Sequence, residues 1–207
     1  MPSPQRIRTP LTDLLGIAHP IMLAGMARTS SGALAAAVSN AGGIGVIGGL
    51  NYTPEQLQEI ISDLKSRLID PSLPFGVDLA IPQLGGNARK TNYDYTRGRL
   101  AELIDVVVRN GARVFVCAVG VPPEWVIRRL HENGILVMNM VGAPKHAKKA
   151  LEAGVDMVCA QGGEGGGHTG KSYTTTYLLH LTRRQGKSPA PSSSPRSATS
   201  PKTTPPR

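Results

Sequence analysis

Short apolar runs alternate with amphipathic stretches along the first 160 residues of the chain. Six runs of five or six residues, partly β-branched and bounded by Gly, Pro or Asn, have the character of buried parallel strands. They begin 23, 32, 38, 22 and 21 residues apart, which is the cadence of strand–helix units. The predicted strands are Pro20–Ala24, Gly43–Ile47, Phe75–Ala80, Arg113–Ala118, Ile135–Met140 and Asp156–Ala160.

Helical patterns lie between these runs. Thr53, Pro54 and Gln56 form an N-cap, a first-turn proline and a capping-box glutamine, which predict a helix start. Three later amphipathic stripes end at glycines, as helices often do. The apolar stripe of the first helix is Leu57, Ile60, Ile61, Leu64 and Leu68, and the later stripes close at Gly111, Gly134 and Gly154.

This alternation predicts an α/β fold with a parallel sheet. Six strands fit either an open doubly wound sheet or an incomplete eight-stranded barrel, and spacing alone does not separate the two. In both, function is expected at the carboxyl ends of the strands. Loops with notable composition follow the first, third and sixth predicted strands, at Gly25-Met26, at 82–87 and at 161–170.

The loop from Gln161 to Gly170 is the strongest candidate for chemistry. Five of the six residues from Gly162 to Gly167 are glycine, so the backbone there can approach a bound group closely. The loop follows a strand-like segment and carries one imidazole, His168, a side chain suited to proton transfer near neutral pH. We therefore predict a functional loop at this strand end.

The net charge of +9 belongs mainly to the C-terminal segment. Residues 171–207 hold seven Lys or Arg and no Asp or Glu, which leaves 16 basic and 14 acidic side chains in residues 1–170. Residues 187–207 are mostly Ser, Thr, Pro, Lys and Arg, a composition that predicts disorder. The basic residues of the segment lack interleaved aromatic rings, so a solvated tail is expected rather than a nucleic-acid interface.

The remaining composition narrows the class of protein. Cys117 and Cys159 lie in apolar runs without CxxC spacing, so we expect buried free thiols in a reducing compartment and no metal site. No segment approaches the roughly 20 apolar residues of a membrane span, and the N-terminal region lacks a continuous apolar stretch. These features predict a soluble cytoplasmic protein.

Two nucleotide-binding patterns occur in the chain. Residues 43–48 match G-x-G-x-x-G, but Val46 and Ile47 continue a strand and no helix opens at the third glycine. Residues 165–172 match the phosphate loop G-x-x-x-x-G-K-[ST], but every acidic residue precedes it, so no later carboxylate can hold magnesium. A glycine-rich strand is the better interpretation of the first, and nucleotide triphosphate binding stays a minor alternative for the second.

Three segments together carry a family resemblance. They are residues 20–26 (PIMLAGM) followed by 41–45, residues 74–79 (PFGVDL), and residues 154–170 with the glycine–histidine loop. In this order and spacing they resemble the nitronate monooxygenases, formerly called 2-nitropropane dioxygenases, which are FMN-dependent (β/α)8-barrel enzymes. The flavin-dependent enoyl-acyl-carrier reductases share much of the pattern and remain an alternative.

The resemblance implies a chemistry and a set of site residues. It implies oxidation of alkyl nitronates or nitroalkanes with O2 to a carbonyl compound and nitrite, with His168 as the base that removes the proton α to the nitro group. A neutral imidazole fits this role because its pKa lies near the working pH. Asp78 stands where the family commonly has Asn, and an ionised Asp cannot donate the hydrogen bond that Asn can. The implied FMN-binding residues are Ala24, Gly25, Met26, Asp78, Gln161, Gly166 and Gly167.

The resemblance covers residues 10–170 and then stops. Family members continue into a seventh and an eighth strand whose ends bind the FMN phosphate, whereas this chain turns basic and proline-rich after Gly170. The expected organisation is a C-terminally truncated barrel of about six βα units over residues 1–170, followed by a tail over 171–207. We therefore expect weak FMN binding and little or no turnover, with a non-catalytic fragment as the alternative.

Overall fold

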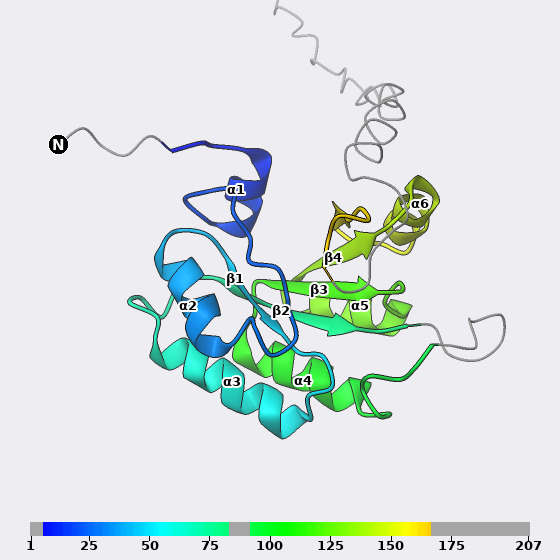
Figure 1. The fold of residues 1–207 in the computed structure, drawn as a ribbon, viewed down its shortest axis with the longest axis horizontal. Helices are drawn as coiled ribbons and strands as arrows, with labels where there is room; N and C mark the ends of the chain where they lie inside the picture. Colours follow the sequence, from blue (N-terminus) through cyan, green and yellow to red (C-terminus); the bar gives the residue numbers. More distant parts are fainter. Residues whose placement is uncertain (1–5, 83–91, 167–207) are drawn as a thin grey trace, which may run out of the picture.

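The computed structural model describes residues 6–82 and 92–166. Within them the chain forms an α/β fold of five parallel strands and six helices (Figure 1). The strands are β1 Gly45–Gly48, β2 Phe75–Ala80, β3 Val114–Val119, β4 Leu136–Val141 and β5 Met157–Ala160. The helices are α1 Pro10–Leu15, α2 Gly32–Asn40, α3 Pro54–Ser66, α4 Leu100–Asn110, α5 Glu124–His131 and α6 Pro144–Glu152.

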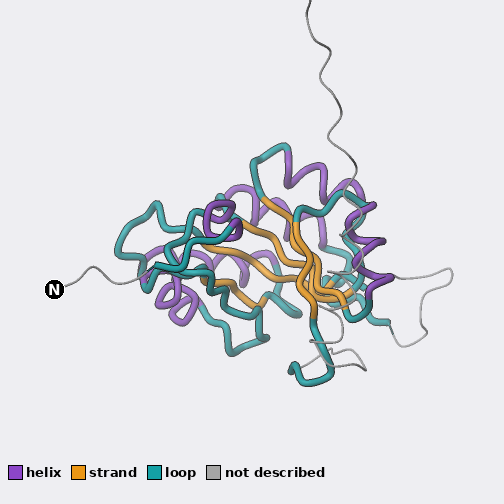
Figure 2. Tube along the Cα trace, turned by 90° about the horizontal axis from the view of Figure 1, so that it is seen from above, coloured by secondary structure: helices purple, strands orange, loops and turns teal. Residues whose placement is uncertain are grey.

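The strand order identifies the architecture. The strands pair in chain order, β1-β2-β3-β4-β5, and every pairing is parallel. A doubly wound sheet reverses its order at a switch point, whereas a singly wound sheet keeps all its helices on one face, as a barrel does. The described residues therefore form part of a TIM-barrel-like fold, and seen from above the strands group at the centre with helices around them (Figure 2).

The main core lies between the outer face of the sheet and helices α2 to α6. Side chains from all five of these helices pack with Val77, Phe115 and Val137 of the sheet in one buried cluster. The helices bury the stripes that the sequence predicts, such as Leu57, Ile61 and Leu64 on α3, each with no exposed surface. Burying such side chains contributes about 1.5–3 kcal/mol each.

A second, smaller cluster covers the inner face of the sheet. Val46, Val114, Val116 and Met138 project there and meet Leu15 of α1 together with Ile17. Helix α1 accordingly lies on the opposite side of the sheet from α3 (Figure 1). This packing covers the inner face, whereas β5 at the end of the sheet stays only partly buried.

The first predicted strand is much shorter in the structure. Of Pro20–Ala24, only Met22 pairs, through an isolated parallel bridge to Ile44. The backbone N–H of Leu23 still donates to the Ile44 carbonyl at 3.0 Å, but the chain then turns, and the Met26 N–H donates to Ala24 O. Because the chain turns at this point, Pro20–Ala24 forms a single bridge and not an extended ladder of hydrogen bonds with a neighbouring strand.

Local signals at helix ends and in the glycine strand are confirmed. Thr53 and Gln56 form the capping box of α3, with Thr53 N donating to Gln56 Oε1 at 2.9 Å. Gly45–Gly48 is strand β1, and the next helix begins only at Pro54, so the first nucleotide-binding pattern has no helix at its third glycine. A Cβ at Gly45 would overlap the Ala35 carbonyl group, so glycine there lets α2 approach the strand closely.

Candidate functional site

The segment Ala24–Met26 forms a shelf over the carboxyl ends of the first two strands. A Cβ at Gly25 would overlap Asp78 on β2, with the carboxyl carbon 2.6 Å away. A Cβ at Gly48, the last residue of β1, would overlap the Met26 carbonyl. The predicted residues Ala24, Gly25, Met26 and Asp78 are thus brought together, at the edge where such folds place their chemistry.

Ser30 holds this shelf in place, although the sequence does not reveal it. Its hydroxyl donates to Ala24 O at 2.6 Å and accepts from Met26 N at 3.1 Å. Its backbone N–H also donates to Met26 O at 2.9 Å, and the residue is only 1% exposed. One side chain therefore ties both ends of the shelf, and only the tertiary structure shows the turn that makes this possible.

Replacing Ser30 by Ala is expected to lower the free energy of unfolding by about 1–3 kcal/mol, because the part-buried Met26 N–H and Ala24 carbonyl lose the hydroxyl of Ser30 as a partner. Urea unfolding of the purified chain measures this change. Ser62 is the matched control, since its hydroxyl donates only to Gln58 O on the exposed side of α3. Equal stability of the Ser30→Ala and Ser62→Ala chains would show that the shelf does not depend on Ser30.

Asp78 is a buried carboxyl group in the carboxyl half of β2, between β1 and β3. It is 4% exposed, and its neighbours across the sheet are Gly48 on β1 and Val116 on β3. Desolvation by burial raises the pKa of Asp78 from 3.8 to about 8, and no cation or hydrogen-bond donor among the described residues offsets it. At neutral pH this side chain is mostly protonated, and it can then donate a hydrogen bond.

The two cysteines are free thiols near this carboxyl group. Burial, followed by the charge of Asp78, raises the pKa of Cys117 to about 12 and also raises that of Cys159. Both thiols therefore stay protonated and unreactive. Cys117 is buried as predicted, whereas Cys159 on β5 is partly exposed because nothing described beyond β5 covers it.

The loop after β5 brings together two further predicted residues. The Gln161 side-chain amide donates to Gly166 O at 3.2 Å, and the Gln161 backbone N–H continues the sheet by donating to Val141 O. The side chain of Gln161 thus spans the beginning of the glycine loop. Gly167 and His168, like the phosphate-loop pattern and the 171–207 tail, lie outside the described residues.

Three histidines lie among the described residues: His19, His131 and His146. His131 Nε2 lies 2.9 Å from Asp156 Oδ2, and the same oxygen accepts from Val137 N at 2.7 Å. His19 contacts Gly42 in the turn before β1, and His146 is exposed on α6. None of the three lies in the shelf segment Ala24–Met26.

Residues 6–82 and 92–166 contain neither a candidate metal site nor a candidate membrane-spanning helix. No group of three or more His, Cys, Asp or Glu side chains is placed to hold a metal ion in that part of the chain. None of the described helices has the length and apolar character needed to cross a membrane. The described residues of the candidate site contribute backbone, carboxyl and amide groups.

Comparison with known sequences identifies one family. A family model described as Nitronate monooxygenase matches residues 8–187. A Mycobacterium tuberculosis protein named (3aS,4S,5R,7aS)-5-hydroxy-7a-methyl-1-oxo-octahydro-1H-indene-4-carboxyl-CoA dehydrogenase is 36% identical over 84% of this chain and 44% of its own length. A probable nitronate monooxygenase of Staphylococcus saprophyticus is 32% identical over 85% of this chain and 55% of its own. The chain spans about half the length of the curated relatives it matches.

Solved structures give the same result. FabK from Thermotoga maritima has a TM-score of 0.72 and 35% identity, covering 86% of this chain and 51% of that protein. A nitroalkane oxidase from Streptomyces ansochromogenes has a TM-score of 0.66 and 30% identity, covering 77% of this chain and 50% of its own. Both matches support the barrel-type fold, and both again cover about half of the solved chain.

Proposed function

The chain belongs to the nitronate monooxygenase family, and from this premise we propose that it binds FMN and oxidises alkyl nitronates or nitroalkanes to a carbonyl compound and nitrite. The observation that carries the proposal is the contact between the Ala24–Met26 shelf and Asp78 at adjoining strand ends. Glycine at position 25 lets a flat ring approach the backbone closely.

The described residues fit a flavin. The shelf is partly exposed, with Met26 41% exposed, and it lies beside the buried Asp78 carboxyl group. Residues proposed to hold the cofactor are Ala24, Gly25, Met26, Asp78, Gln161, Gly166 and Gly167. When bound, FMN supplies the two-electron redox chemistry.

The chain's own part in the reaction is positioning and proton transfer. We assign to His168 the removal of the proton α to the nitro group, which needs a base of pKa near neutrality. Asp78, protonated at neutral pH, is a hydrogen-bond donor at the shelf. Gln161 spans the start of the loop that leads to His168 and limits the loop's freedom.

FMN titration followed by flavin fluorescence, with nitrite release from a nitroalkane, tests the proposal. We expect the full chain to bind FMN weakly, and Gly25→Ala to abolish that binding because its Cβ overlaps Asp78. Gly134→Ala is the control for backbone strain away from the shelf, since Gly134 has φ of 69°, its added Cβ meets no atom within 4 Å, and it precedes the amino end of β4. A chain that binds no FMN in any form is a non-catalytic fragment, and tightly held flavin with fast nitrite release contradicts the expectation of weak binding.

A second candidate function is dehydrogenation or reduction of a thioester substrate. The Mycobacterium tuberculosis relative, 36% identical, is named as a carboxyl-CoA dehydrogenase. A base that removes a proton α to a nitro group can also remove one α to a thioester carbonyl, so the two reactions need the same residue type. Oxidation of an acyl-CoA without nitrite release from nitroalkanes would favour this alternative.

A further inference from the structure

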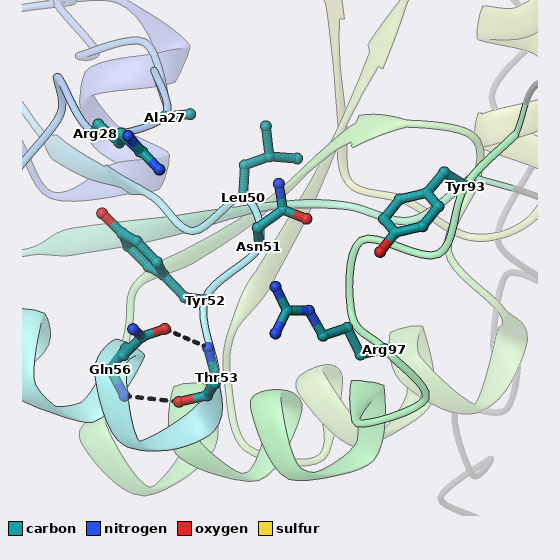
Figure 3. Close-up of a pocket in the computed structure, with 9 residues that line it drawn as sticks. All are labelled: Ala27, Arg28, Leu50, Asn51, Tyr52, Thr53, Gln56, Tyr93 and Arg97. Atoms are coloured by element: carbon teal, nitrogen blue, oxygen red, sulfur yellow. Dashed lines mark hydrogen bonds between the residues drawn. The ribbon is translucent and has the colours of Figure 1, made fainter.

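A cavity of about 510 Å³ opens beside the shelf (Figure 3). Its walls come from three segments that are distant in sequence: Ala27 and Arg28 after the shelf, residues 50–53 with Gln56 after β1, and Tyr93 with Arg97 before α4. Because Ala27 directly follows Met26, the cavity adjoins the carboxyl ends of the strands. It therefore lies next to the proposed cofactor site without including the residues assigned to it.

The cavity is positively charged. Arg28 and Arg97 contribute two guanidinium groups, and none of the described residues that line the cavity is acidic. Neither arginine forms an ion pair with a described residue, whereas nearby Arg99 bridges Glu55 at 2.7 Å and Glu102 at 2.6 Å. The two cavity arginines are thus available to an external anion, and guanidinium groups match phosphate geometry well.

Aromatic and polar groups complete the wall. Tyr93 is 57% exposed and is held edge-on by Tyr95, with ring centroids 5.5 Å apart. The guanidinium group of Arg97 points toward the side of the cavity where Asn51, Tyr52 and Thr53 lie (Figure 3). A flat ring can lie against tyrosine while arginines hold an attached phosphate.

The backbone around the cavity is unusual. Arg28 and Asn51 have φ of 63° and Arg97 has φ of 52°, and these are the three non-glycine residues with positive φ in the part of the chain that the structure describes. All three line this one cavity. Such conformations are energetically unfavourable and gather at ligand sites, where they direct side chains.

We propose that this cavity binds the phosphate-bearing nucleotide part of a second substrate, with Arg28 and Arg97 on the phosphates and Tyr93 against the base. CoA thioesters and nicotinamide dinucleotides share this chemistry, since both contain adenosine phosphate. The inference names a substrate class for the thioester reaction given above as the second candidate function, and it rests on that function, since oxidation of a nitronate by O2 uses no nucleotide. The binding itself can be measured without FMN or turnover.

Titration of the full chain with ADP, by calorimetry without FMN, tests the site. Each arginine–phosphate contact is worth about 1.5–3 kcal/mol, so Arg28→Gln with Arg97→Gln should weaken ADP binding about 100-fold or more. Arg109→Gln is the matched control, because Arg109 lines a separate cavity of about 280 Å³ that also contains Glu55, Glu102 and Asp105. This control should change the affinity less than twofold, and both chains should keep the parental unfolding midpoint.

The outcomes separate the alternatives. ADP binding that survives the double substitution assigns it to the basic 171–207 segment and overturns the proposal. Competition of FMN with ADP, lost in the double variant, would mean that the cavity takes the flavin phosphate and would also overturn it. CoA and NADH, titrated in parallel, identify the source by the tighter binding. FMN binding lost with ADP binding retained contradicts the proposed function alone.

Discussion

An Asp78→Asn chain is expected to be more stable than the parent by up to about 4 kcal/mol at pH 7. Burial raises the pKa of Asp78 from 3.8 to about 8, so between these values the folded chain holds a proton that the unfolded chain releases. Each pH unit between the two values costs about 1.4 kcal/mol. In the parent chain, the contribution of Asp78 to the free energy of unfolding is fully present below pH 4, and it is lost as the pH rises towards 8. Asn has no charge to desolvate, although burying its amide offsets part of the gain.

Urea unfolding of both chains from pH 5 to pH 8 measures the effect. The difference in unfolding free energy should grow by about 1.4 kcal/mol per pH unit and flatten near pH 8. Asp105→Asn is the control, because Asp105 is 44% exposed and pairs with Arg129 at the surface. Its stability should run parallel to that of the parent. Parallel curves for Asp78→Asn as well would show that Asp78 ionises normally in the folded chain.

This burial also changes the meaning of the one departure from the family pattern at the shelf. An ionised Asp78 could only accept a hydrogen bond, whereas the family's Asn can also donate one. With its pKa near 8, the carboxyl group is mostly protonated at neutral pH and has an O–H to donate. Asp at position 78, where the family has Asn, therefore still provides a hydrogen-bond donor. Its ionisation at higher pH, however, makes the stability of the folded chain depend on pH.

Sequence patterns predicted the elements whose signals are local. Helix α3 carries a capping box and an amphipathic stripe, and the structure confirms both at Pro54–Ser66. Helix α2, Gly32–Asn40, has no charged residue and an almost uniformly small, apolar surface, so its pattern gives no helical face. It forms because Ser31 caps it and because Gly45 lets it pack against β1.

The site was predictable only as far as the residue types go. Resemblance placed the shelf and Asp78 together, and the overlap at Gly25 supports that placement. Ser30 was not predictable, because a lone serine carries no signal until the turn that brings it to Ala24 and Met26 is known. The arginine cavity was missed for a similar reason, since Arg28 and Arg97 lie 69 positions apart and come to line one cavity only through the fold.

Replacing His168 by Ala is expected to lower nitrite release from a neutral nitroalkane by about 100-fold to 10,000-fold, measured with the full chain at saturating FMN. The range is that of general-base catalysis at a carbon acid, where the base must take the α proton before oxidation can proceed. His146→Ala is the matched control, because His146 is exposed on α6, outside the shelf. The control should retain the parental rate.

A comparison of a nitroalkane with its preformed nitronate makes this test more specific. A preformed alkyl nitronate has already lost the α proton, so its oxidation does not need the base. His168→Ala should therefore keep most of its activity on the nitronate while losing it on the parent nitroalkane, and raising the pH should partly restore the nitroalkane reaction as solvent deprotonates the substrate. Equal losses on both substrates would mean that His168 acts in binding or in shaping the loop, because a pure base cannot matter to a substrate that has no proton to give. The ratio of the two rates thus separates proton transfer from every structural role of the loop.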